Sequence, residues 1–595
     1  MRGTEGVFDE MVAVLDGWRS LPPEEQIVRL WLLGMEREQI VAVAYAEARI
    51  QARLARMPID DAVRQTVLHA LRWAWRDEEM HAVYVRGVLK SQGGWLQSAQ
   101  TTLARLQGGV AGWVSAVQQH HRWREAPVAR AIAEVLEIGG TLAGKVPAEA
   151  RAALQFKSFK DFAVFNVDAE RTAELAWRRM VELAASPGVH VPEADVEAFA
   201  RMAEDEARHA ALFEVLYRSF DDADRLVDGL DAEALFARIA AVDPVMVPSS
   251  VSGVGFGGRV QVVQGAQVAE RESAFEALIS DSGLLERVRP GMHVAVKTVF
   301  MRGTHRDDPS PIVAPVLIRR LAELLVSRGA RVSVLEAPNL YDRFLGGRSV
   351  DEVARYFGID GPFTLVDAAA DAVPGPYRRG TAQRTVSRAW AEADLRIAFG
   401  KLACHPVDQA ALVMDALQGL GAPTEGFLFA DRRADRATSM LMVLDQYPPH
   451  LALLDAWSDV ADGVAGVLGS AWPATPLRFY AGEDALAVDR VVARDLGVVL
   501  SAVHPLKQAL DWFGDPLPDL TIDGHDGPIE DWRGVYHTPG SSLLGLLAFP
   551  MFERGSRRGA LFVPRTDSDA FPPRVPPTRL QRGMRSVVRR LLDLA

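Results

Sequence analysis

Two short stretches of the chain, RDEEMHA at residues 76–82 and EDEARHA at residues 204–210, each place a glutamate three residues before a histidine. Side chains three positions apart lie on the same face of an α-helix, so each stretch directs one carboxylate and one imidazole the same way. A lone Glu-x-x-His pair is common on exposed helices. Its repetition in similar flanking sequence predicts a shared role for the two stretches.

Each stretch has a matching segment upstream. AEARIQARLARM contains Glu47 and AERTAELAWRRM contains Glu170, and in both segments the glutamate lies ten residues before a methionine. Glu47 precedes Glu78 by 31 residues, and Glu170 precedes Glu206 by 36. Apolar residues recur every three or four positions through these segments, as they do in amphipathic helices. The N-terminal region is therefore predicted to be all-α, with one helical hairpin that occurs twice.

A di-metal carboxylate site in a four-helix bundle takes one Glu from each of two helices and Glu-x-x-His from each of the other two. In the order and spacing of these residues, the segment from 35 to 220 resembles the ferritin-like superfamily, which includes rubrerythrin-type proteins and di-iron oxidases. Carboxylates combined with imidazole suit iron or manganese, so we expect two iron ions, with a Mn/Fe pair as the alternative. The predicted metal ligands are Glu47, Glu78, His81, Glu170, Glu206 and His209.

Three further acids lie close to these ligands in the sequence. Glu174 follows Glu170 by four residues and shares its helix face, either as a seventh ligand, as a proton relay or as a solvent-facing residue. Asp77 and Asp205 each precede a predicted ligand. They either orient a histidine on a facing helix, as carboxylates behind metal-bound imidazoles do, or lie exposed. We therefore treat all three as candidates for residues that support the metal ligands.

The composition excludes several classes of protein. The chain has 595 residues, a net charge of −12 and a single cysteine, Cys404. The negative charge argues against nucleic-acid binding, and one cysteine excludes an iron–sulfur cluster held within the chain. No apolar run approaches the length of a membrane span, and the acidic N-terminus does not resemble a signal peptide. We expect a cytoplasmic protein that binds neither nucleic acid nor membrane, with a homodimer left open as its assembly.

The sequence changes in character near residue 243. Residues 1–242 form the predicted helical domain, residues 243–265 are rich in Pro, Ser and Gly and are predicted to be a linker, and residues 266–595 alternate apolar runs with helical patterns. That alternation predicts an α/β domain with a mainly parallel sheet. Predicted strands include HVAVKTVF, RVSVLEAP and LRIAFGKLA, and predicted helices include SPIVAPVLIRRLAELLVSRG and QAALVMDALQGL.

Three short motifs, AVKTVF, GKLACHP and AGEDALAVD, follow one another along this half of the chain. In their order they resemble the motifs of the family called domain of unknown function 362, over residues 290–500, although Thr298-Val299 stands where Pro-Asn is usual. Ligands of open α/β sheets bind at the ends of strands. The residues of a predicted crevice there are Lys297, Lys401, His405, Asp484 and Asp489. The lysines are candidates for holding an anionic substrate; the alternative is that these side chains cap turns and helices or pack in the core.

Taken together, the motifs predict an O2-dependent non-haem di-iron oxidase or oxygenase that acts on a small organic substrate. Its α/β domain would bind or process the same substrate, and electrons would come from an external donor, because the rubredoxin-like cysteines of typical rubrerythrins are absent. One alternative is a ferritin-like or rubrerythrin-like protein that handles iron or peroxide without an organic substrate. The other is catalysis in the α/β domain, with a purely structural helical domain.

Overall fold

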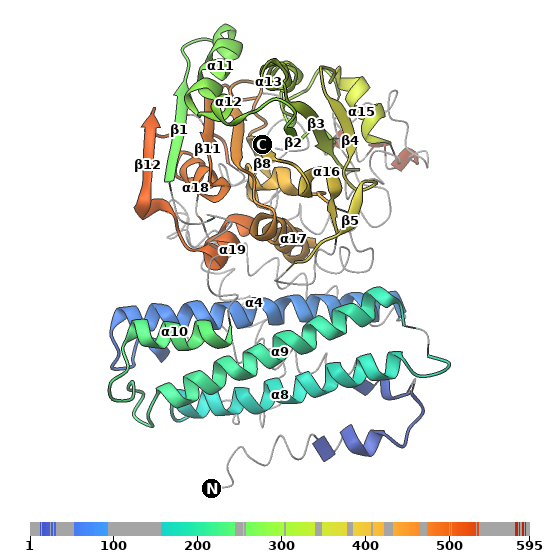
Figure 1. The fold of residues 1–595 in the computed structure, drawn as a ribbon, viewed down its shortest axis with the longest axis vertical. Helices are drawn as coiled ribbons and strands as arrows, with labels where there is room; N and C mark the ends of the chain where they lie inside the picture. The colour runs from blue at the N-terminus through green and yellow to red at the C-terminus, as the bar shows by residue number, and fades with distance from the viewer. Residues whose placement is uncertain are drawn as a thin grey trace.

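The protein consists of a layer of long helices and an α/β part that lies against it (Figure 1). The computed structural model describes, with gaps, residues 12–30, 53–92, 156–243, 254, 258–534 and several positions between 578 and 590. The predictions of a helical N-terminal region and of a mainly parallel sheet in the C-terminal half are both confirmed.

The helical layer contains the residues of both Glu-x-x-His stretches. Its described helices are α4 (Asp61–Gln92), α8 (Phe159–Ala184), α9 (Glu193–Ser219) and α10 (Ala232–Val242). A capping box between Ser158 and Asp161 begins α8, since each side chain accepts a hydrogen bond from the other residue's backbone N–H. The buried positions of α8 then recur at three and four, from Phe159 to Leu183. Glu170 lies on this buried face, so its carboxylate points into the interior of the helical layer.

Helices α8 and α9 pack along each other, and α4 and α10 lie on the side nearer to the sheet (Figure 1). The sequence predicts one more helix around Glu47, but residues 31–52 lie outside the described part of the chain. Among the described helices, none combines the length and the apolar character that crossing a membrane requires.

The α/β part is built on an eight-stranded sheet with the order β12-β1-β11-β10-β7-β2-β3-β4. Its strands are β1 (Gly258–Gln264), β2 (His293–Lys297), β3 (Arg331–Glu336), β4 (Thr364–Asp367), β7 (Leu395–Lys401), β10 (Leu451–Ala456), β11 (Arg478–Gly482) and β12 (Leu520–Gly524). Strand β11 runs antiparallel to both of its neighbours, and every other neighbouring pair is parallel. Successive strands β2, β3 and β4 are added towards one edge of the sheet, and β7, β10 and β11 are added towards the other edge. The strand order therefore reverses between the neighbours β2 and β7.

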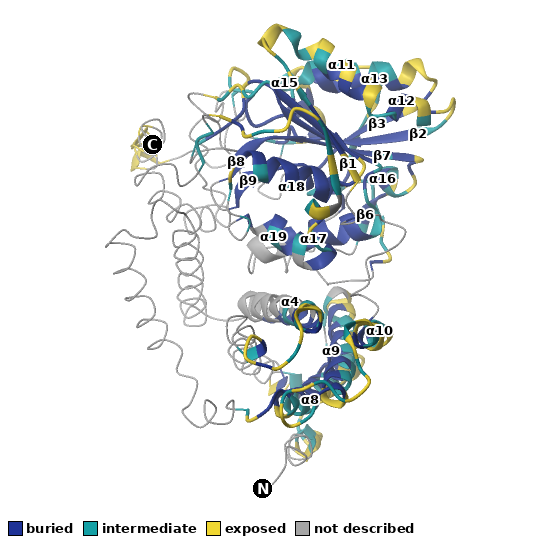
Figure 2. Cartoon of the chain, turned by 90° about the vertical axis from the view of Figure 1, so that its left-hand side faces the viewer, coloured by how far each residue is buried: buried dark blue, intermediate teal, exposed yellow. Residues whose placement is uncertain are grey.

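Helices cover both faces of the sheet, as Figure 2 shows. One face carries α11 (Arg271–Asp281), α12 (Leu284–Arg287), α13 (Pro315–Ser327) and α15 (Val350–Phe357). The other carries α17 (Arg432–Gln446), α18 (Ala485–Asp495) and α19 (His504–Phe513). The shorter elements are η2 (Val268–Glu270), α16 (Arg388–Ala391), η3 (Met414–Leu417), η6 (Leu517–Asp519) and the two-stranded pairs β5 (Ala372–Pro374) with β6 (Thr385–Ser387) and β8 (Ala403–His405) with β9 (Gln409–Ala411).

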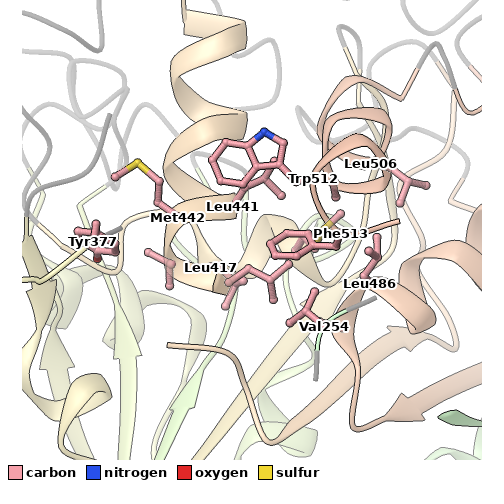
Figure 3. Close-up of a cluster of buried hydrophobic side chains, with 14 of the residues drawn as sticks. Val254, Tyr377, Leu417, Leu441, Met442, Leu486, Leu506, Trp512 and Phe513 are labelled. Atoms are coloured by element: carbon pink, nitrogen blue, oxygen red, sulfur yellow. The ribbon is translucent and has the colours of Figure 1, made fainter. Parts of the chain in front are cut away.

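The face covered by α17 to α19 also meets the helical layer. Helix α4 contacts α17 and α19, and the Arg201 side chain of α9 donates to the backbone oxygen of Tyr377. A cluster of buried side chains from α17, α18, α19 and η3, including Leu441 and Trp512, packs against this face of the sheet (Figure 3). Because this cluster is continuous with the apolar core of the helices, the helical layer and the α/β part share one hydrophobic core.

Two sequence predictions about local structure are wrong. Strand β1 begins at Gly258, inside the segment predicted as a linker, because Val260 and Val262 are buried between β11 and β12. The segment QAALVMDALQGL was predicted to be a helix, but it forms β9 and the short η3. In a helix, the backbone N–H groups of Val413 and Met414 would donate to carbonyl oxygens one turn earlier. Here both donate to the Asp489 carboxylate of α18 instead. These tertiary hydrogen bonds replace the helical ones.

Candidate metal centre

Four buried side chains from three helices converge in the helical layer. Glu78 of α4, Glu170 of α8, and Glu206 and His209 of α9 each offer a ligand atom, and these four atoms all lie within 4.8 Å of one another. All four side chains are at most 2% exposed. A group of carboxylates and imidazole at this spacing is suited to holding a metal ion. The structure thus brings together four of the six predicted metal ligands, and Glu47 lies outside the described residues.

His81 lies beside this group and faces it with Nδ1. That atom is 3.5 Å from Glu206 Oε1 and 3.9 Å from Glu78 Oε1, and it makes no hydrogen bond. The other ring nitrogen, Nε2, lies 3.1 Å from Asp205 Oδ2. Since a carboxylate accepts, Nε2 carries a proton, so Nδ1 is the ring atom that faces the cluster and can bind either a second proton or a metal ion there.

His209 of α9 is held in the same way by residues of α4. Its Nδ1 lies 3.2 Å from Glu78 Oε1 and 3.8 Å from Glu206 Oε2, and its Nε2 lies 3.1 Å from Asp77 Oδ2. The two imidazole rings are 6.3 Å apart between centroids. Each aspartate beside one Glu-x-x-His stretch therefore contacts the histidine of the other stretch, and Glu78 and Glu206 both lie between the two rings.

A single guanidinium connects the aspartates behind the histidines. Arg208 forms an ion pair with Asp205, and its Nη2 lies 3.8 Å from Asp77 Oδ2 while its Nη1 lies 3.7 Å from Asp243 Oδ1. Burial raises the pKa of Asp205, but Arg208 and His81 outweigh that effect and lower it to about 2. Asp205 is therefore a firm hydrogen-bond acceptor for His81 at any ordinary pH.

The cluster attracts positive charge strongly. Burial lowers the pKa of His81, yet Asp205 and Glu206 outweigh burial and raise that pKa well above its usual value. The pKa of His209 is raised in the same way by Asp77, Glu206 and Glu78, again against the effect of burial. An excess of buried carboxylates favours any cation that enters, whether a proton or a metal ion.

Neighbouring side chains fix the cluster on the side of α8. The indole Nε1 of Trp177 donates to Glu206 Oε1 at 3.0 Å, and the Trp177 ring stacks on Phe199 with 6.0 Å between centroids. Glu174 lies elsewhere, since its carboxylate pairs with Arg178 at 2.7 Å near the surface. Of the three nearby acids singled out in the sequence, the structure places Asp77 and Asp205 against the histidines and Glu174 away from them.

In the α/β part, two predicted lysines lie at the carboxyl ends of the strands where the sheet order reverses. Lys297 ends β2, and its Nζ donates to Glu336 Oε2 at 2.7 Å. Lys401 ends β7, and its Nζ donates to Asp455 Oδ2 at 3.0 Å. Both lysines are at most 4% exposed. Each buried ammonium thus already has a carboxylate on the adjacent strand as its partner.

The other three predicted crevice residues have hydrogen-bond partners of their own. Asp484 follows β11, which runs antiparallel, so it lies at the opposite sheet edge and caps α18 through Leu486 N. Asp489 is fully buried within α18 and binds backbone N–H groups. His405 is buried at the end of β8, where its Nδ1 accepts from Asp408 N at 3.0 Å. The antiparallel direction of β11 therefore separates Asp484 from the lysines, while Asp489 and His405 are engaged in hydrogen bonds to backbone N–H groups.

Several residues of these networks were not found from the sequence. Near the metal ligands they are Trp177, Arg208 and Asp243, which no local pattern distinguishes from other helix residues. At the sheet edge they are Glu336 and Asp455, and here a signal exists. Each is a carboxylate at or near the end of an otherwise apolar strand, in RVSVLE and LALLDA.

Comparisons with known proteins place only part of the chain. No curated protein matches it. Among solved structures, the lactate racemase apoprotein from Thermoanaerobacterium thermosaccharolyticum matches with 13% sequence identity and a TM-score of 0.22, over 34% of this chain and 51% of that one; so low a score does not identify a fold. Residues 294–494, from β2 to the end of α18, match the family model of a domain of unknown function, DUF362.

Proposed function

We propose that the helical layer holds a dinuclear non-haem iron centre and that the protein is an O2-dependent oxidase or oxygenase acting on a small organic substrate. The observation that carries this proposal is the convergence of Glu78, Glu170, Glu206 and His209 within 4.8 Å. It fits a ferritin-like bundle, in which paired helices supply these residue types to two metal ions. The segment around Glu47 would complete the ligand set.

The atoms that face the cluster suit a metal. His81 Nδ1 is buried without a hydrogen bond, and a buried polar atom without a partner is costly unless something binds it. In both histidines Nε2 bonds to an aspartate, which leaves Nδ1 as the donor atom towards the centre. Metal-ligating histidines are held in this way by carboxylates behind them.

The charge balance points the same way. The described carboxylates of this network, all buried, face one guanidinium, that of Arg208. They are Asp77, Glu78, Glu170, Asp205, Glu206 and Asp243. Buried carboxylates in such excess are costly without cations. Two divalent ions offset most of the negative charge, and carboxylate with imidazole ligands favours iron or manganese.

Each residue has a distinct role in this proposal. Glu78 and Glu206 lie within reach of both histidines, and these two carboxylates, Glu170 and the imidazoles of His81 and His209 would hold the ions. When bound in the ferrous state, the pair supplies electrons to O2. Trp177 keeps a Glu206 oxygen in place through its hydrogen bond. The complete burial of Glu170, Glu206 and both imidazoles excludes bulk water, as an oxidative reaction requires.

The α/β part would bind or process the substrate of the same reaction. Helix α4 carries Glu78 and His81 and also contacts α17 and α19, so the α/β part lies directly against a helix of the centre. An external reductase would return the electrons, since Cys404 is the only cysteine of the chain.

The proposal is tested by metal analysis of protein loaded anaerobically with Fe(II), followed by exposure to O2. We expect about two iron ions per chain, loss of nearly all iron in Glu78→Ala/Glu206→Ala, and wild-type iron in Glu174→Gln, whose carboxylate pairs with Arg178 instead. The proposal is refuted if the wild-type protein takes up no iron under these conditions and its two histidines bind protons in place of a metal. Iron oxidation that never yields an organic product would favour iron handling instead.

A further inference from the structure

A cavity of about 490 Å³ lies at the sheet edge opposite to the two lysines. It opens where β1, β7 and β10 begin and where β11 ends. We call it the arginine cavity, after the basic side chains in its wall. The charged and imidazole side chains of its wall are Arg259, Arg287, Arg396, His450, Glu483 and Asp484, and the Asp484 carboxylate caps α18 by accepting from Leu486 N. Arg396 and Lys401 belong to the same strand and are separated by roughly 16 Å of extended chain, so this cavity is separate from the lysine pairs.

Arg396 is the half-buried cation of this cavity. Its Nε donates to Pro448 O at 2.8 Å, and its Nη2 lies 3.5 Å from His450 Nε2. Within the described residues, no carboxylate pairs with it. Burial lowers the pKa of its guanidinium, since no carboxylate among the described residues offsets the cost of burying the charge. A partly desolvated cation next to an open cavity favours an anion from solution.

Arg287 adds a second guanidinium to the wall. Its Nη1 donates to His450 O at 3.2 Å and to Glu483 Oε1 at 2.9 Å. The Glu483 side chain is 76% exposed, so this ion pair is weak and readily exchanged. Arg259 lies further out and pairs with Asp523 on the exposed side. The inner part of the cavity is therefore lined by two guanidinium groups that are not tied to buried carboxylates.

His450 lies close enough to Arg396 and Arg287 for both guanidinium groups to affect its pKa. Burial lowers its pKa, and Arg396 and Arg287 lower it further, to about 4. Its Nδ1 accepts from Arg396 N at 2.9 Å, which leaves the proton on Nε2. At neutral pH the imidazole is uncharged and offers an N–H group. Two cations and this donor make a surface suited to an anion.

We propose that the arginine cavity binds an anionic small molecule, held through a phosphate or carboxylate group by Arg396 and Arg287. Guanidinium groups bind both kinds of oxyanion through paired N–H donors. The volume is in the range of small-molecule sites. The overall charge of −12 repels anions at long range, so affinity has to come from these local contacts. The site is independent of the iron centre.

The test is isothermal titration of the full-length protein with pyrophosphate and, separately, with citrate in a chloride-free buffer. We expect saturable binding of one of them, and the stronger of the two identifies the group as phosphate or carboxylate. Arg396→Gln should weaken that binding roughly tenfold or more. Arg319→Gln is the matched control, because Arg319 pairs with Asp360 on the exposed surface of α13. It should bind as the wild type does.

A second variant guards against a folding artefact. Glu483→Gln removes the carboxylate that competes for Arg287, so we expect it to tighten anion binding several-fold. A damaged fold does not produce tighter binding. The proposal is overturned if neither anion binds the wild type saturably, if Arg396→Gln binds with unchanged affinity, or if Glu483→Gln fails to bind more tightly.

Discussion

Asp77 on α4 accepts a hydrogen bond from His209 on α9, with Oδ2 and Nε2 3.1 Å apart. Asp205 on α9 does the same for His81 on α4. Each helix therefore orients a histidine of the other, since Asp77 of α4 fixes His209 and Asp205 of α9 fixes His81. Neither half of the proposed centre is complete on its own helix.

Removing one of these carboxylate charges should weaken metal binding. We expect Asp77→Asn to lower the affinity for Fe(II) roughly 10- to 100-fold, because an amide no longer fixes the His209 tautomer or increases its basicity. Competition with a chelator measures the change. Asp61→Asn is the control, since Asp61 is an exposed residue at the start of α4 that pairs with Arg64. Equal affinities of Asp77→Asn and the wild type would contradict the assigned role.

Arg208 should be important for stability as well as for the site. Replacing it by Met leaves Asp77, Asp205 and Asp243 buried without their shared cation. We expect the metal-free protein to lose about 3–5 kcal/mol in the free energy of unfolding, measured by urea denaturation. Arg218→Met, on the exposed face of the same helix, should cost less than about 1 kcal/mol. Similar losses in both variants would rule out the network.

The pair between Lys401 and Asp455 should behave as one unit. Both side chains are at most 4% exposed, so Lys401→Met leaves a buried carboxylate and should destabilise by about 3–5 kcal/mol. Lys401→Met/Asp455→Asn should lose clearly less than the sum of the two single variants, by about 1–3 kcal/mol. Urea unfolding of the four proteins measures this coupling. Additive losses would show that the two charges do not interact.

Asp415 gives a pH dependence with a defined sign. Burial raises its pKa from 3.8 to about 6 in the folded protein, so the folded state binds the proton more tightly than the unfolded state does. The carboxyl therefore destabilises once it is ionised, and stability falls as pH rises from about 4 to 7. We expect Asp415→Asn to gain about 2–3 kcal/mol over the wild type at pH 7 and little at pH 4. A stability difference that does not change with pH would contradict this.

The sequence was sufficient to predict which side chains meet in the helical layer. The doubled Glu-x-x-His pattern selected Glu78, His81, Glu206 and His209, since a helix face follows directly from spacing. It could not predict that Arg208 joins Asp77 to Asp243. That contact depends on how three helices cross, and nothing in the local sequence encodes the crossing.

In the α/β part, strands β2, β3 and β7 were predicted from their apolar runs. The direction of β11 was not predicted, because an antiparallel strand in a parallel sheet has the same local pattern. That one strand moved Asp484 to the opposite edge, away from Lys297. The η3 segment was missed for a similar reason, since Asp489, 75 residues away from Met414, holds its backbone.

Helix α4 makes contacts on two faces, one towards α9 and the candidate metal ligands and one towards α17 and α19. A fragment cut near residue 243 would uncover apolar surface that α17 and α19 normally protect, so it should aggregate unless that surface is redesigned. Because α17 and α19 touch the helix that carries Glu78 and His81, a displacement of either helix would be transmitted to these two side chains. A molecule that shifts α17 or α19 on binding would thereby alter the candidate metal centre without touching it.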